Sequence, residues 1–107
     1  MKFKVELTQK ARFELKEILR WLKSRSRVGA QRWSRRWEKV VSTLESHMHS
    51  FGLAPESEDH DEPVYQVVFK TRSGLPYRAL FSIHQDVISI LHVRGPGQDI
   101  LGPDELE

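Results

Sequence analysis

Four basic side chains in the second half of this sequence are placed where they could do chemistry together. They are Lys70, Arg72, Arg78 and Arg94. Guanidinium and ammonium groups that converge repel one another, so a fold normally gathers them only where an anion compensates their charge. Phosphate is the common anion, because arginine binds its oxygens bidentately. We therefore predict a phosphate-binding patch. The alternative is that these are ordinary solvent-facing charges on an uncovered sheet.

His92 lies two residues before the last of these bases. Histidine exchanges protons readily near neutral pH, so either His92 or Lys70 is a candidate general base. The alternative for His92 is a plain strand histidine. The sequence contains no cysteine and no zinc, calcium, phosphate-loop or serine-triad pattern. We expect a site with no metal and no cofactor.

The first half of the chain predicts one strand and two helices that would support this patch. Apolar and charged residues alternate over 3–7, as in a short strand with one buried face. Apolar residues recur at helical spacing over 8–24, where Thr8 can cap the helix. After a break at 24–29, a second helix should run up to Gly52 and pack antiparallel to the first. Its apolar stripe consists of Trp33, Trp37, Val40, Val41, Leu44 and Met48.

The second half predicts a loop followed by three strands. Residues 53–63 hold two prolines and five acids without periodicity, which is typical of a loop. Strand-like runs follow at 64–72, 77–84 and 87–94, and the two residues Gln85-Asp86 form a hairpin turn. The resulting order is an N-terminal strand, a two-helix hairpin and a three-stranded antiparallel meander. This order predicts an α+β fold with the helices on one face of the sheet.

Strict alternation along the meander separates an apolar face from a mixed one. The apolar face, expected to pack on the helices, contains Tyr65, Val67, Phe69, Thr71, Tyr77, Ala79, Phe81, Ile83, Val87, Ser89, Leu91 and Val93. The mixed face contains Gln66, Val68, Lys70, Arg72, Arg78, Leu80, Ser82, His84, Ile88, Ile90, His92 and Arg94. Every base of the meander falls on this mixed face, which we expect to be exposed.

Composition and charge distribution narrow the class of protein. A length of 107 residues, with 38% hydrophobic and 30% charged residues, predicts one folded domain over 1–107. Residues 1–50 hold 13 Lys/Arg and five Asp/Glu, whereas the loop 53–63 and the tail 95–107 are acidic. This separation favours a basic body that meets a polyanion or an acidic partner; ordinary solvated helix charge is the alternative. Without a signal-peptide pattern or an apolar run of about 20 residues, we expect a cytoplasmic protein with no membrane partner.

The stretch from Val67 to Ile83, followed by Ile88 to Arg94, resembles the RelE/ParE superfamily of type II toxins. Its most specific parts are the Tyr77-Arg78 pair before an apolar strand and the apolar run ending in Val93-Arg94. The similarity covers most of the chain, from residue 3 to about residue 101. It implies the RelE-like β-α-α-β-β-β fold and a small antitoxin partner, acidic or DNA-binding, encoded next to the toxin.

The resemblance implies one of two activities on the same fold. RelE-like toxins cleave mRNA in the ribosomal A site, whereas ParE-like toxins poison DNA gyrase and cleave nothing. In the first group, basic sheet residues bind the RNA and stabilise the charge on the scissile phosphate. The matching catalytic and RNA-binding positions here are Lys70, Arg72, Arg78 and Arg94. We interpret the chain as a metal-independent mRNA endonuclease that inhibits growth, with gyrase inhibition as the alternative.

This chain departs from RelE after its last arginine. RelE has a tyrosine there that stacks on the base, but residues 95–101 contain no aromatic residue. The antitoxin is expected on the mixed sheet face, which combines bases with apolar side chains and would suit an acidic amphipathic segment. The residues expected to contact it are Val68, Leu80, Ile88, Ile90, Arg78 and Arg94.

Overall fold

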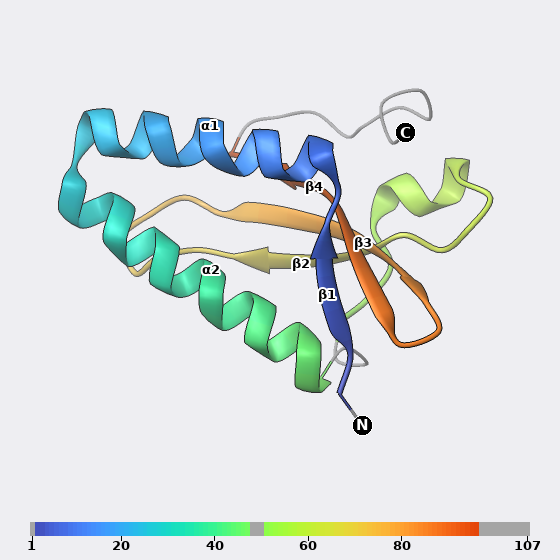
Figure 1. Cartoon of the computed structure of the whole chain (residues 1–107). Helices are drawn as coiled ribbons and strands as arrows, with labels where there is room; N and C mark the ends of the chain where they lie inside the picture. The colour runs from blue at the N-terminus through green and yellow to red at the C-terminus, as the bar shows by residue number, and fades with distance from the viewer. Residues whose placement is uncertain (1, 48–50, 97–107) are drawn as a thin grey trace.

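The computed structural model describes residues 2–47 and 51–96 of the chain. Within them the element order is β1 (Lys4–Leu7), α1 (Gln9–Arg25), α2 (Arg27–His47), the short 3-10 helix η2 (Pro55–Asp59), β2 (Tyr65–Phe69), β3 (Tyr77–His84) and β4 (Val87–Arg94). Figure 1 shows the helical hairpin followed by the strands. The predicted α+β fold and its element order are confirmed.

The four strands form one mixed sheet in the order β1-β4-β3-β2. Strands β2, β3 and β4 pair antiparallel, as the meander prediction required. Strand β1 lies at the edge and pairs parallel with β4, so that Lys4 is opposite Val87 and Leu7 is opposite Ile90. Parallel strands need a long crossover connection. Here the connection from β1 to the rest of the sheet begins with the whole α1–α2 hairpin, which crosses one face.

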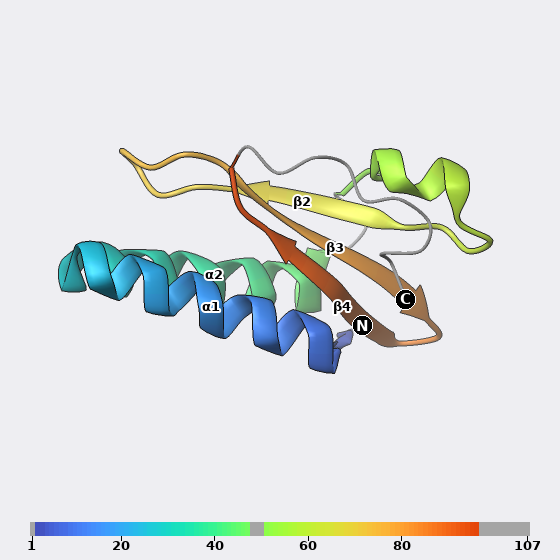
Figure 2. The same cartoon turned by 90° about the horizontal axis from the view of Figure 1, so that it is seen from above.

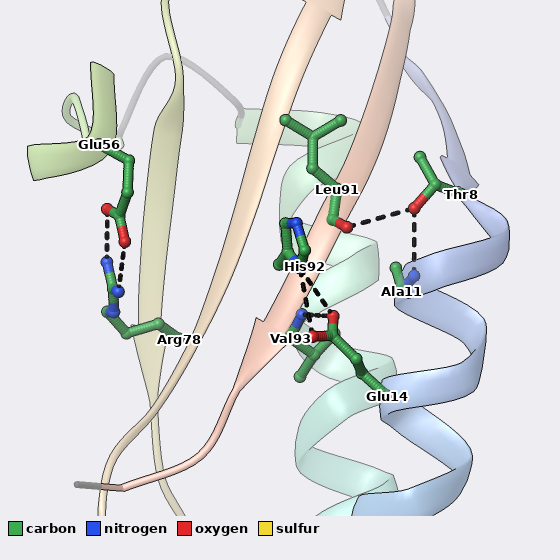
Figure 3. A network of polar contacts seen from close by, with 8 residues as sticks. All are labelled: Thr8, Ala11, Glu14, Glu56, Arg78, Leu91, His92 and Val93. Atoms are coloured by element: carbon green, nitrogen blue, oxygen red, sulfur yellow. Dashed lines mark hydrogen bonds and ion pairs between the residues drawn. The ribbon is translucent and has the colours of Figure 1, made fainter. Parts of the chain in front are cut away.

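Helix α1 begins where its sequence predicts. The Thr8 hydroxyl accepts a hydrogen bond from the Ala11 backbone N–H at 3.1 Å and donates one to the Leu91 carbonyl at 3.2 Å. The first bond satisfies a backbone N–H that has no partner inside the helix. The second fastens the start of α1 to β4, and both are drawn in Figure 3. Thr8 therefore sets the position of the helix on the sheet.

The break between the helices is shorter than the predicted 24–29. Helix α1 ends at Arg25 and α2 begins at Arg27, so Ser26 alone separates them. The Ser26 hydroxyl accepts a hydrogen bond from the Gly29 backbone N–H at 3.0 Å, which is the bond of a helix N-cap. Gly29 therefore lies inside the first turn of α2 and does not interrupt the chain.

An aromatic cluster joins the helical hairpin to the sheet. Trp33 and Trp37 are buried, as their helical spacing predicts. The Trp33 ring centroid lies 5.2 Å from that of Tyr77, and both tryptophan centroids lie 5.6 Å from that of Phe69. Buried aromatic side chains of this size are among the largest single contributors to stability, at about 3–5 kcal/mol when truncated to alanine. The cluster therefore fixes how α2 lies across the sheet.

A register shift in the sheet overturns part of the face prediction. Phe81 pairs with Ile90 but Leu80 pairs with His92, so Leu91 is an extra residue on β4. Such a bulge reverses which residues point to a given face. As a result Ile88 and Ile90 are fully buried in the core under the helices. The prediction that they are exposed on the mixed face is wrong, and Leu91 lies on the side opposite to the one predicted.

The acidic segment after α2 covers part of the opposite sheet face. Figure 2 shows η2 on the far side of the sheet from the helical hairpin. A second apolar cluster lies there, made of Ala54, Val64, Leu80 and Leu91. The Val64 backbone N–H donates to the Ser57 hydroxyl at 3.0 Å, and its carbonyl accepts from the Ala54 N–H at 2.8 Å. The predicted loop 53–63 is thus an ordered cover, and Leu80 is buried beneath it, not exposed.

Candidate functional site

The predicted basic patch divides into two pairs. Arg78 and Arg94 are direct cross-strand partners on β3 and β4, so their side chains share one sheet face. Lys70 and Arg72 are exposed, but β2 ends at Phe69, before either of them. The structure therefore brings Arg78 and Arg94 together as predicted. It places the other two bases in the β2–β3 turn, not on a strand.

Arg78 is already paired with a carboxylate. Its two terminal nitrogens, Nη1 and Nη2, lie 2.9 and 2.7 Å from the two Glu56 carboxylate oxygens, a bidentate arrangement drawn in Figure 3. Nη1 also donates to the Gln66 amide oxygen at 3.0 Å. The Glu56 side chain is 0% exposed and that of Arg78 is 20% exposed. The carboxylate thus occupies the position in which a phosphate would bind this guanidinium.

This ion pair explains how the acidic segment stays on the sheet. A carboxylate that leaves water without a partner is strongly unfavourable, and bidentate pairing with arginine compensates much of that cost. Glu56 stands in η2, 22 positions before Arg78 in the sequence. The sequence predicted only an acidic loop around Glu56 and did not predict its ion pair with Arg78. The only signal was a run of acids preceding a strand that carries arginine.

His92 is a buried connection between β4 and α1. Its residue exposure is 1%, and its Nδ1 atom lies 3.1 and 3.2 Å from the two carboxylate oxygens of Glu14. Because a carboxylate only accepts, Nδ1 carries the hydrogen in this contact. Glu14 also accepts a hydrogen bond from the Val93 backbone N–H at 3.1 Å. The geometry favours the plain structural histidine over the general base.

A pocket that sequence reasoning missed lies between the helical hairpin and the β2–β3 turn. Its volume is about 900 Å³ and its walls are mostly apolar. Phe13, Trp21 and Leu75 line it and are all largely exposed, at 54–68%. None of the predicted basic residues or His92 lines it. The available signal was the position of Phe13 and Trp21, which are large aromatic residues outside the apolar stripe of the first helix.

Two of the residues that line this pocket, Trp33 and Tyr77, carry polar groups. Trp33 lines it, and its indole Nε1 is buried without a hydrogen-bond partner among the residues the structure describes. A buried donor of this kind normally finds an acceptor. Tyr77 lines the pocket too, and burial raises the pKa of its phenol, so the hydroxyl stays protonated at neutral pH. The mostly apolar lining of the pocket suits an apolar group.

No metal cluster or membrane helix appears in the described part of the chain. Residues 2–47 and 51–96 contain no group of three or more His, Cys, Asp or Glu side chains that could hold a metal ion. Within the same ranges, neither helix is both long and apolar enough to cross a bilayer.

Comparison with known proteins gives one match. A sequence model of the family described as "ParE toxin of type II toxin-antitoxin system, parDE" matches residues 5–100. The matched range includes every described element from the second residue of β1 to the end of β4. No curated protein and no solved structure matches the chain.

Proposed function

The chain belongs to the ParE toxin family of type II toxin–antitoxin systems, and on that premise we propose that it arrests growth by binding DNA gyrase and cleaves no RNA. ParE-like activity is the alternative that the superfamily resemblance left open. One observation carries the choice: two of the residues predicted for RNA cleavage, Arg78 and His92, are engaged elsewhere. His92 is bound to Glu14 in the interior, and Arg78 is bound to Glu56.

Cleavage of a phosphodiester by side chains alone makes two demands. Preorganised cations must face the phosphate where charge develops, and a base must reach the attacking hydroxyl. Arg78 would have to release a carboxylate that is 0% exposed before it could meet a phosphate. His92, at 1% exposure, offers no accessible face to a nucleotide. These two facts support a toxin that acts through its surface, without chemistry of its own.

The test is a supercoiling reaction with purified gyrase, relaxed plasmid and the purified toxin. We expect loss of supercoiling and accumulation of cleaved gyrase–DNA complexes as the toxin approaches the gyrase concentration. A second type II topoisomerase in a parallel reaction serves as the specificity control. Full gyrase activity at toxin concentrations that arrest growth would contradict the proposal and would favour the ribonuclease interpretation.

A toxin of this type has an antitoxin partner, and we propose that the antitoxin docks its apolar side chains in the pocket between α1 and the β2–β3 turn. The sheet face predicted for this role offers little apolar surface, since Leu80, Ile88 and Ile90 are buried. The pocket instead exposes Phe13 and Trp21.

A matched pair of variants tests this docking site by calorimetry with the product of the neighbouring antitoxin gene. Trp21→Ala should weaken binding at least about tenfold, because truncating a central aromatic anchor costs roughly 2 kcal/mol or more. Val28→Ala is the control, since Val28 is similarly exposed, at 55%, but does not line the pocket. Val68→Asp probes the predicted sheet face in the same assay. Loss of binding in Val68→Asp with none in Trp21→Ala would place the antitoxin on the sheet.

A further inference from the structure

The bend of the helical hairpin carries the densest basic charge of the chain. Residues 20–39 contain eight Lys/Arg and one acid, Glu38. Figures 1 and 2 show the bend between α1 and α2 at the same end of the molecule as the β2–β3 turn, which carries Arg72. The bend lies far from the β3–β4 turn, which is at the opposite end of the molecule. The bend and the β2–β3 turn therefore place basic residues at the same end of the molecule.

Along α2 these bases follow a helical stripe. Arg32, Arg35, Arg36 and Lys39 are spaced i, i+3, i+4 and i+7, which places them on one side of a helix. Three of them are exposed and Arg36 is half-buried. The stripe turns away from Trp33 and Trp37, which pack on the sheet. This side of α2 is thus an outer surface with a regular array of cations.

The stripe continues into a shallow groove where α1 and α2 meet. The groove has a volume of about 540 Å³. It is lined by Lys23, Arg27, Ala30, Gln31, Ser34 and Arg35. Arg35 belongs to both features. We call the six cations Lys23, Arg27, Arg32, Arg35, Arg36 and Lys39 the basic hairpin face.

These six cations form no ion pair with a carboxylate in the part of the chain that the structure describes. In the described ranges, none of them lies within ion-pair distance of an acid; of the bases between residues 20 and 39 only Arg20 does, at 3.1 Å from Glu17. Arg25 instead stacks on the Trp21 ring, 4.9 Å from its centroid. Like charges three and four residues apart on a helix destabilise it slightly. Within residues 2–47 and 51–96 no carboxylate pairs with these six cations to offset that cost, whereas Glu56 pairs with Arg78.

We propose that the basic hairpin face binds the phosphate backbone of duplex DNA. An array of long cationic side chains beside polar Gln31 and Ser34 has the chemistry of nonspecific backbone contacts. Single-stranded nucleic acid normally adds stacking on aromatic rings. Trp33 and Trp37 of α2 are buried, the groove has no aromatic residue in its lining, and the exposed Trp21 of α1 lines the other pocket. The wide major groove of B-form DNA admits a helix, whereas the deep, narrow groove of A-form RNA does not.

Fluorescence anisotropy with a labelled mixed-sequence DNA duplex tests the proposal on the full chain. Two triple variants carry the same change in net charge. Arg32→Gln/Arg35→Gln/Lys39→Gln removes part of the face, whereas Lys10→Gln/Arg12→Gln/Lys16→Gln removes exposed bases from the other end of α1. The first should bind DNA about 10-fold or more weakly, with a salt slope lower by about 2 to 3. The second triple variant should lose much less affinity for DNA. Circular dichroism checks that both variants fold.

Three results would overturn the proposal. The first is an equal loss of affinity in the two triple variants, which would mean that DNA binding depends on net charge and not on the position of the bases. The second is tighter binding to duplex RNA or to a single strand than to the DNA duplex. The third is no binding to DNA at low salt. The assay contains no gyrase, so its outcome is independent of the proposed gyrase activity, which the supercoiling reaction tests separately.

Discussion

Arg78 on the sheet and Arg35 on the helical hairpin belong to two basic regions of the same small protein, and their surroundings differ. Arg78 is mostly buried and bound bidentately by a carboxylate from η2. Arg35 is exposed, lines a groove and forms no ion pair with an acid of the described residues. The residue type is the same in both places. What differs is whether the fold supplies the anion, and that decides whether the arginine holds the structure together or remains available to an external partner.

The sheet region gives the largest expected effect. Arg78→Ala would leave the fully buried Glu56 carboxylate without this partner, which should destabilise the protein by about 3–5 kcal/mol. Urea denaturation measures the change. Arg72→Ala is the matched control, because that side chain is exposed and should change stability by less than about 0.5 kcal/mol. Similar values for the two variants would mean that Arg78 is as available as Arg72, and the contrast between the regions would collapse.

A second, partly buried carboxylate, that of Glu14, tests whether His92 is structural. Glu14→Ala removes the acceptor of both the His92 ring and the Val93 backbone N–H. Leaving buried donors unsatisfied should cost about 1–3 kcal/mol. Glu17→Ala, one turn further along α1 on a more exposed side chain, should cost much less. If Glu14→Ala is neutral in thermal unfolding, His92 has more freedom than its contacts indicate.

Phosphate should replace the missing carboxylate if Glu56 occupies an anion position. In Glu56→Ala, inorganic phosphate at about ten times its dissociation constant should restore roughly 1.4 kcal/mol of stability. Wild-type protein should gain less, since its Glu56 carboxylate fills the position. Glu58→Ala is the control, because Glu58 is exposed in the same short helix. Equal phosphate stabilisation of all three proteins would show that the ion binds elsewhere.

The smallest effect on stability is expected at the basic hairpin face. Replacing Arg32, Arg35 and Lys39 by glutamine relieves repulsion and keeps good helix formers, so stability should change by less than about 0.5 kcal/mol. The measurement is the same urea titration as for Arg78→Ala. A loss of several kcal/mol in the free energy of unfolding would instead show that these bases are structural. The basic hairpin face and the Arg78 region would then not differ in this respect.

Local patterns predicted most of the fold. The hydroxyl of Thr8, the spacing of Trp33 and Trp37 and the Gln85-Asp86 turn each act within a few residues, and the structure confirms all of them. The Gln85 backbone has a positive φ of 59°, as a tight hairpin turn requires. These features can be predicted from the sequence because the residues that produce each of them lie within a few positions of one another.

The site was less predictable because the residues that contact one another there are far apart in the sequence. The extra residue Leu91 reverses the faces of β4, and no local pattern marks a bulge in an apolar run. The partner of Arg78 stands in the acidic segment, and that of His92 on α1, 78 positions away. The sequence correctly placed Arg78 and Arg94 side by side. It could not show that carboxylates had already engaged Arg78 and His92.

The central claim, that this toxin arrests growth without cutting RNA, is tested most directly on ribosomes. Purified toxin would be added to defined mRNA on ribosomes with an empty A site, and new 5′ ends would be mapped by sequencing. We predict no new ends even when the toxin exceeds the ribosomes. Cuts within the A-site codon that disappear in Arg94→Ala would contradict the claim, since they would show that the sheet arginines act on phosphate despite the Glu56 pair.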